Sequence, residues 1–180
     1  NTSDYAFGVS LPYPNEPLYL SFKYAEIGEN FEPALGFVRR QGVRAYASAL
    51  SLVARPQDGW FREIRSSLNA EVFTDLDNHL DSGEFRFNFF EAEFHSADEL
   101  EFEAEHSIDR PIEDFEIADG IVIPAGDYAW TEGSMILTMA RKRTVAVETI
   151  LTAGEFYDGN RQRAGIEIDY LPNKHLSLEL

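Results

Sequence analysis

The stretch Leu18–Ala25, which reads LYLSFKYA, decides the fold class of this chain. Every second residue in it is large and apolar: Leu18, Leu20, Phe22 and Tyr24. Because successive side chains of a β-strand point to opposite faces of the sheet, a period of two predicts a strand with one apolar face. The same alternation recurs along most of the chain between turn signals, and it predicts about ten strands and no helix.

The segments on either side of this stretch carry the same signal. Upstream, residues 5–11 predict a first strand, whereas residues 12–17 contain three prolines and predict a turn, because proline cannot donate to a β-ladder. Downstream, the alternation of residues 85–94 reverses its parity at Phe89 and Phe90, which predicts a β-bulge. Residues 157–160 predict a hairpin turn.

Two regions lack the period of two, namely residues 26–42 and 107–127, and we predict irregular connections there. Gly28 and Gly36 permit tight bends in the first region, which we expect to fold against or into the barrel mouth as a partial plug or rim. The length predicts a single domain over residues 1–180. Because the alternation runs on to the last residue, we interpret the chain as a fragment of a longer protein.

Composition and charge exclude several classes of function. The net charge of −17 argues against nucleic-acid binding, because phosphate contacts need clustered Lys and Arg. The sequence contains no Cys, which excludes disulfides and thiolate metal sites. No segment has the roughly 18 consecutive apolar residues typical of a transmembrane helix.

Two all-β architectures fit the pattern. A soluble sandwich or small barrel has strands of about five or six residues, whereas a transmembrane β-barrel has strands of about 9 to 11 residues and aromatic girdles. Several segments exceed the soluble length, and aromatic residues lie near their ends: Tyr5, Tyr24, Phe73, Tyr128, Trp130, Tyr157 and Tyr170. We therefore predict an all-β, antiparallel up-and-down meander that forms a transmembrane β-barrel or a fragment of one.

Several segments resemble those of a known protein family. The matching segments, in order, are Glu26–Phe31, Pro33–Arg39, Arg55–Pro56, Thr74–Asp77, Ile121–Tyr128 and Gly154–Gly159. They are similar to bacterial outer-membrane β-barrel proteins of unassigned function, in which an N-terminal module resembles a family 9 carbohydrate-binding domain. The resemblance implies that this chain is part of the C-terminal barrel region, in a Gram-negative outer membrane. It implies outer-membrane lipid and the rest of the parent chain, or other subunits, as partners.

The sequence shows no catalytic constellation, and we predict that the chain is not an enzyme. The four histidines lack metal-ligand spacing, and no Gly-x-Ser-x-Gly elbow occurs. A hydrolase whose acids line a cleft is an open alternative. The candidate ligands for Ca²⁺, the one cofactor the sequence suggests, are Asp75, Asp77, Asp81 and Glu84. A plain acidic turn explains the same residues.

The predicted function is an outer-membrane barrel that acts as a pore, an anchor or a ligand-binding barrel. The alternative is a soluble β-sandwich or calyx-like barrel that binds a small or carbohydrate ligand. Apolar residues are predicted to face lipid or a packed core: Leu18, Leu20, Phe22, Leu100, Phe102, Ile166 and Ile168. Acidic residues are predicted to face water: Glu99, Glu101, Glu103, Glu167 and Asp169. The acids of residues 99–105 form either a cation-attracting wall or simply the wet face of a strand.

Overall fold

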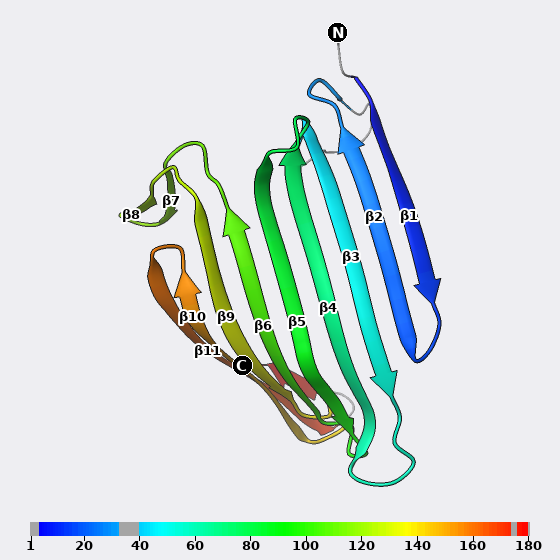
Figure 1. The fold of residues 1–180 in the computed structure, drawn as a ribbon. Helices are drawn as coiled ribbons and strands as arrows, with labels where there is room; N and C mark the ends of the chain where they lie inside the picture. The colour runs from blue at the N-terminus through cyan, green and yellow to red at the C-terminus, as the bar shows by residue number, and fades with distance from the viewer. Residues whose placement is uncertain (1–3, 33–39, 174–175, 180) are drawn as a thin grey trace.

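A computed structural model describes residues 4–32, 40–173 and 176–179. The described residues form twelve β-strands and no helix (Figure 1). The strands are β1 (Ala6–Pro14), β2 (Leu18–Ile27), β3 (Val43–Ala54), β4 (Phe61–Asp75), β5 (Leu80–Phe94), β6 (Glu99–Asp109), β7 (Phe115–Ala118), β8 (Ile121–Ile123), β9 (Tyr128–Thr138), β10 (Val145–Phe156), β11 (Gly159–Asn173) and β12 (Leu176–Glu179).

Ten of these strands form one sheet, in the order β1-β2-β3-β4-β5-β6-β9-β10-β11-β12. Each strand pairs antiparallel with its neighbour, so the sheet is an up-and-down meander, as predicted. The sheet is twisted, and among the described residues it stays open, with β1 at one edge and β12 at the other (Figure 1). An open meander of this kind is compatible with a fragment of a barrel.

The register divides the sheet into an apolar face and a polar face. Opposed residues in an antiparallel ladder lie on the same face. One such row crosses four strands and contains Leu20, Leu50, Leu68 and Phe87. The neighbouring row on the other face contains Ser21, Ala49, Asn69 and Arg86.

The predicted sidedness agrees with this register. The residues predicted to face lipid or a core all lie on the apolar face, and the acids predicted to face water all lie on the polar face. The apolar face is nevertheless open to solvent: Leu20 is 43% exposed, Phe87 46% and Ile166 66%. The large apolar side chains of the meander therefore do not pack into a second layer of the described residues.

The two ends of the sheet differ in their connections. At the upper end of Figure 1 lie the described residues 28–32 and 40–42, the connection of residues 110–127 and two short turns. At the lower end all the described connections between β1 and β11 are short turns, at residues 15–17, 55–60, 95–98 and 139–144. Below, these are called the upper end and the lower end.

An ion pair joins two of the lower-end turns. The guanidinium of Arg143 donates to both carboxylate oxygens of Asp98, at 2.5 and 2.6 Å. The backbone N–H of Ala140 donates to the same carboxylate at 2.9 Å. These contacts, first the Arg143 guanidinium and then Ser96 and the Ala140 amide, lower the pKa of Asp98 to about 2. The β5–β6 turn is thereby held against the β9–β10 turn.

Two predicted boundaries are wrong. Residues 12–14 were predicted as part of a turn, but β1 continues through Pro12 to Pro14. The reason is that β1 is an edge strand, where a proline nitrogen can face away from the ladder. Within the region predicted as irregular at 107–127, β6 runs to Asp109 and β7 pairs with β8 in a separate hairpin.

Other local predictions are confirmed. The register of β5 against β6 shifts between Asn88 and Phe90, so Phe89 is the extra residue of a β-bulge. The β10–β11 hairpin turns at Tyr157 and Asp158, as predicted. In the other predicted irregular region, β2 extends to Ile27 and β3 starts at Val43. Residues 33–39 of the segment expected to act as a plug or rim lie outside the described residues.

Candidate functional site

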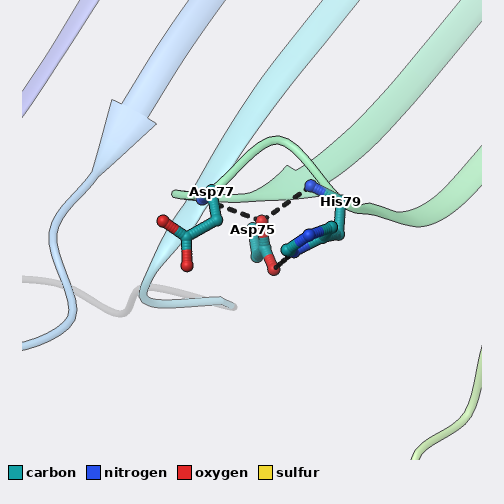
Figure 2. A group of neighbouring side chains, drawn as sticks. All are labelled: Asp75, Asp77 and His79. Atoms are coloured by element: carbon teal, nitrogen blue, oxygen red, sulfur yellow. Dashed lines mark hydrogen bonds and ion pairs between the residues drawn. The ribbon is translucent and has the colours of Figure 1, made fainter.

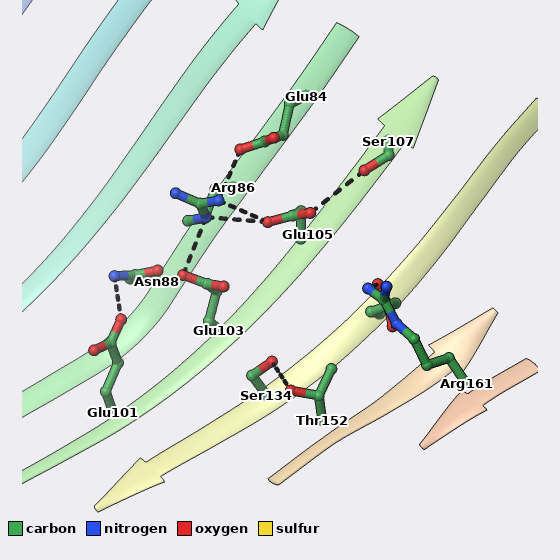
Figure 3. A network of polar contacts seen from close by, with 11 residues as sticks. Glu84, Arg86, Asn88, Glu101, Glu103, Glu105, Ser107, Ser134, Thr152 and Arg161 are labelled. Atoms are coloured by element: carbon green, nitrogen blue, oxygen red, sulfur yellow. Dashed lines mark hydrogen bonds and ion pairs between the residues drawn. The ribbon is translucent and has the colours of Figure 1, made fainter. Parts of the chain in front are cut away.

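The polar face carries a network of ion pairs centred on Arg86 of β5 (Figure 3). Its Nη2 atom lies 2.8 Å from Glu84 Oε1 and 2.8 Å from Glu105 Oε2. Its Nε atom lies 3.4 Å from Glu103 Oε2. A single guanidinium thus serves three carboxylates on two strands. The network is incompletely neutralised, because one positive charge faces three negative charges.

Asn88 lies next to this network and is directly opposed to Glu103. Its amide nitrogen donates to Glu101 Oε1 at 2.5 Å (Figure 3). Its amide oxygen, Oδ1, is buried and has no hydrogen-bond partner among the described residues. Unsatisfied buried acceptors are uncommon in folded proteins, so this oxygen stands out among the polar groups of the face.

A second ion pair crosses three strands further along the same face. Arg161 of β11 donates through Nε to Glu132 Oε1 of β9 at 2.8 Å, and through Nη2 to Glu132 Oε2. Gly154 of β10 lies opposite both residues and therefore between them. A Cβ atom at Gly154 would come within 2.4 Å of the Thr131 carbonyl oxygen, so only glycine fits there. Glu132 is 5% exposed, and its burial requires this bidentate partner.

Aromatic residues cover the upper end of the polar face. The ring centroid of Trp130 lies 4.4 Å from that of Tyr157, and Phe115 of β7 lies 5.8 Å from Tyr157. The Tyr157 hydroxyl donates to Asp109 Oδ2 at 2.7 Å. Burial, and secondly this hydrogen bond, raise the pKa of Tyr157. The cluster attaches the β7–β8 hairpin to the main sheet.

The aromatic residues predicted near strand ends do not form one girdle. Tyr5 and Tyr24 lie at the upper end of the apolar face, where both hydroxyls donate to Glu26. Phe73 and Trp130 lie on the polar face, because their opposed residues belong to polar rows. The division follows from the register, which the sequence pattern alone does not give.

Two hollows on the polar face share the residues Glu71 and Glu84. One has a volume of about 330 Å³ and reaches Lys23, with Ala47 and Ala49 of β3 among the residues that line it. The other has a volume of about 350 Å³ and is lined by aromatic, acidic and hydroxyl side chains, among them Phe73, Trp130, Asp109 and Ser107. The small side chains of β3 explain the first hollow, since longer side chains stand on both sides of them.

The candidate calcium ligands separate into two groups. Asp75 and Asp77 lie together with His79, and one ligand atom of each falls within 4.8 Å of the others (Figure 2). Asp81 instead pairs with Arg40 at 2.8 Å, and Glu84 belongs to the Arg86 network. The structure therefore brings together two of the four predicted residues and adds a histidine.

The Asp75 carboxylate is already engaged by its own turn. Its Oδ1 atom accepts the backbone N–H groups of Asp77 and His79, both at 2.8 Å, and its Oδ2 atom lies 2.8 Å from His79 Nδ1 (Figure 2). The side-chain hydrogen bond with Asp75 raises the pKa of His79. Calcium takes six to eight oxygen ligands. Two exposed carboxylates and an imidazole supply few of these, so the geometry favours an acidic turn, and the calcium site stays a prediction.

The sequence did not identify the residues that organise the polar face. Arg86, Asn88, Arg161 and Gly154 become partners only through the register of strands distant in sequence. Their signal in the sequence is weak, since each sits at a polar position of an alternating strand.

Comparison of the chain with protein-family models, curated proteins and solved structures finds no match. Among the described residues, no helix is long and apolar enough to cross a membrane.

Proposed function

We propose that this chain forms part of the wall of a β-barrel in a bacterial outer membrane, where it acts as a pore, an anchor or a ligand-binding barrel. Outer-membrane lipid would contact the apolar face. The rest of the parent chain, or other subunits, would pair with β1 and β12, the outer strands of the described sheet. A non-enzymatic role remains part of this proposal.

One observation carries the proposal: large apolar side chains are exposed on one face of the sheet, while several acids of the other face are half-buried. The side chains of Glu103 and Glu93 on the polar face are 16% and 21% exposed, whereas Leu20 and Phe87 on the apolar face are 43% and 46% exposed. Water-soluble domains rarely expose large apolar patches. A lipid-facing apolar surface and a polar interior are characteristic of transmembrane barrels.

Strand length and aromatic placement support the same proposal. The strands β2 to β6 and β9 to β11 contain 10 to 15 residues each. About 9 to 11 residues suffice for a tilted strand to cross a bilayer. At the upper end of the apolar face, Phe7, Tyr24 and Tyr46 form a chain of contacts with centroid distances of 5.8 and 5.2 Å. Phe61 contacts Phe94 at 5.2 Å near the lower end.

The placement of the longer connections indicates how the proposed barrel wall would be oriented in the outer membrane. Outer-membrane barrels have short turns on the periplasmic side and longer loops on the extracellular side. In this chain β2 ends and β3 begins at the upper end, with fifteen residues of sequence between them, and the connection of residues 110–127 lies there too. The upper end would therefore face the exterior of the cell.

The test is partitioning of the purified chain between buffer, detergent and lipid vesicles. The proposal expects the chain to require detergent for solubility and to float with vesicles in a density gradient after reconstitution. Alkaline carbonate washing should leave it in the vesicle fraction, because its apolar face is buried in hydrocarbon. A chain that behaves as a monodisperse protein without detergent, and that carbonate removes from vesicles, would refute the proposal.

The two hollows on the polar face favour ligand binding as a second candidate function. They provide carboxylates at Glu71 and Glu84, hydroxyl groups and the ring of Trp130, which suit a small polar ligand such as a carbohydrate. A calyx-like soluble barrel would use the same hollows. Calorimetric titration with a panel of neutral sugars tests this candidate, and binding that is lost in Glu71→Gln but kept in Glu116→Gln would support it.

A further inference from the structure

A block of four glutamates lies on the polar face across β5 and β6. Glu91 is directly opposed to Glu101, and Glu93 is directly opposed to Glu99. These four residues are called the acidic block below. Like charges opposed on neighbouring strands destabilise a sheet. The arrangement therefore needs positive charge from another source.

Arginines neutralise only one side of the acidic block. Arg62 Nη2 lies 2.7 Å from Glu93 Oε1, and Arg65 Nη1 lies 3.9 Å from Glu91 Oε1. Both contacts are on the β5 side. Among the described residues, neither Glu99 nor Glu101 on the β6 side has an ion-pair partner.

The unsatisfied oxygen of Asn88 is an independent sign that, in the described part of the chain, a hydrogen-bond donor is missing next to the acidic block. Asn88 binds Glu101 through its amide nitrogen, which leaves its buried Oδ1 atom on the side of Glu103, its opposed residue (Figure 3). A hard carbonyl oxygen close to carboxylates is a ligand that cations prefer. Among the described residues, Asn88 Oδ1 thus lacks a hydrogen-bond donor beside carboxylates that Arg86 neutralises only in part.

The acidic excess continues along the polar face toward β11. Glu105 is opposed to Glu132, and Glu148 is opposed to Glu167. Arg161 neutralises Glu132, while Arg141 lies 4.0 Å from Glu167. The polar face of β5, β6 and β9–β11 thus bears more negative than positive charge along most of its height.

We infer that this polar face is selective for cations, so that a barrel wall built from it admits or accumulates small hydrated cations and repels anions. This inference rests on the proposed function, because an acidic face acts on ions most strongly where low-dielectric walls enclose it. Rings of Asp and Glu are the usual source of cation preference in channels. The preference comes from the potential of the whole face, with the acidic block as its strongest part.

The experiment compares two variants that change net charge equally. In the first, the four glutamates of the acidic block become glutamine: E91Q, E93Q, E99Q and E101Q. In the control, four acids of the upper-end connection become amides: E113Q, D114N, E116Q and D119N. Glutamine preserves the size of glutamate and removes the repulsion between the opposed carboxylates, so we expect the first variant to fold. Heat-dependent mobility in detergent gels and circular dichroism verify its folding.

Two readouts are needed, one without conduction and one with it. In detergent, Tb³⁺ luminescence sensitised by aromatic residues should fall severalfold in the acidic-block variant and stay close to wild type in the control. In planar bilayers under a KCl gradient, the reversal potential should show a preference for K⁺ over Cl⁻. That permeability ratio should fall severalfold in the acidic-block variant only.

The outcomes separate this inference from the proposed function. Currents without a K⁺ preference, or Tb³⁺ binding unchanged in the acidic-block variant, would overturn the cation inference and leave the membrane proposal standing. If no current appears but Tb³⁺ binding still depends on the acidic block, cation attraction is supported and the pore assignment fails. Equal losses in both variants would show that net charge alone is responsible and would also overturn the inference.

Discussion

At the scale of single residues, the polar face depends on groups that act across several strands. Arg161 reaches Glu132 only because the residue between them, Gly154, has no side chain. Such a position is hard to recognise in a sequence, because glycine in a strand more often marks a bulge or a bend. The acidic turn at Asp75 was recognisable, since closely spaced polar residues with Asp are typical of turns.

Substitution of Gly154 by alanine should destabilise the fold by about 1–3 kcal/mol, the usual cost of forcing extra atoms into a packed place. The new Cβ would come within 2.5 Å of the Glu132 Cα and disturb the ion pair above it. Gly165→Ala is the matched control, because nothing lies within 4 Å of a Cβ at Gly165. Urea titration in detergent measures both variants. Equal stability of the two would contradict the role assigned to Gly154.

The Asp98–Arg143 pair should make stability depend on pH in the acid range. The folded pKa of Asp98 is about 2, whereas an unfolded aspartate titrates near about 3.9. Its contribution is therefore complete above about pH 4 and is lost as the pH falls toward 2. Asp98→Asn should lower stability by about 1 kcal/mol at neutral pH, a value reduced by partial exposure.

The check on Asp98 is thermal unfolding in detergent as a function of pH. The difference between wild type and Asp98→Asn should shrink as the pH falls from about 4 to about 2. Asp58→Asn in another lower-end turn is the control, because no hydrogen bond or ion pair involves the Asp58 side chain among the described residues. A difference that is constant with pH would contradict the mechanism.

At the scale of elements, the period of two predicted the strands well, because residue alternation is a direct consequence of strand geometry. The period of two failed to predict strands whose limits depend on the neighbouring strand or whose length is too short to show a period. Pro12 and Pro14 are accepted in β1 because it is an edge strand, which the sequence of β1 does not reveal. The hairpin β7–β8 was missed because its strands have only 4 and 3 residues, too few to display a period.

The bulge at Phe89 permits a specific test of register. Phe89 is extra with respect to both neighbours of β5, since Asn88 and Glu91 pair with residues two apart on β4. Deletion of Phe89 should therefore leave the apolar and polar sets on their own faces, with nearly normal yield of folded protein. Deletion of Ala70, in a regular part of β4, should abolish folding, because a shift of one residue moves the rest of the strand to the wrong face.

Folding of the two deletion variants is measured by heat-dependent gel mobility and protease resistance in detergent. Wild type run in parallel sets the scale. If both deletions were tolerated, the register would be less specific than the ladder indicates. Loss of folding in the Phe89 deletion alone would mean that the bulge itself is required.

At the scale of the whole molecule, the sequence indicated two faces but not which of them is exposed. Alternation assigns residues to faces, whereas exposure depends on what covers each face. The structure shows half-buried acids and exposed large apolar residues, as in the contrast between Glu103 and Leu20. The metal and ligand sites were even harder to predict from the sequence than the exposed face, because they combine side chains from separate strands. These side chains meet only after the register is set.

Adjacent residues of β2 provide a test of the membrane-facing side. Leu20→Arg places a charge on the apolar face, and Ser21→Arg places the same charge on the polar face. In lipid vesicles, Leu20→Arg should reduce stability by up to about 2–4 kcal/mol, the cost at the bilayer midplane, while Ser21→Arg should change it little. Folding titrations in urea with vesicles measure both. The opposite ranking would show that the polar face contacts lipid.

The outward backbone groups of the edge strand β1 determine where a further strand can pair with the sheet. The Tyr5 carbonyl accepts from Gly28 N–H on the β2 side at 2.8 Å, so the backbone groups of the alternate residues Ala6, Gly8 and Ser10 point outward. Pro12 and Pro14 occupy the next outward positions and have no N–H to offer. A strand added at this edge would therefore form its first hydrogen bonds near the upper end of β1. Pairing would then extend from there toward the lower end.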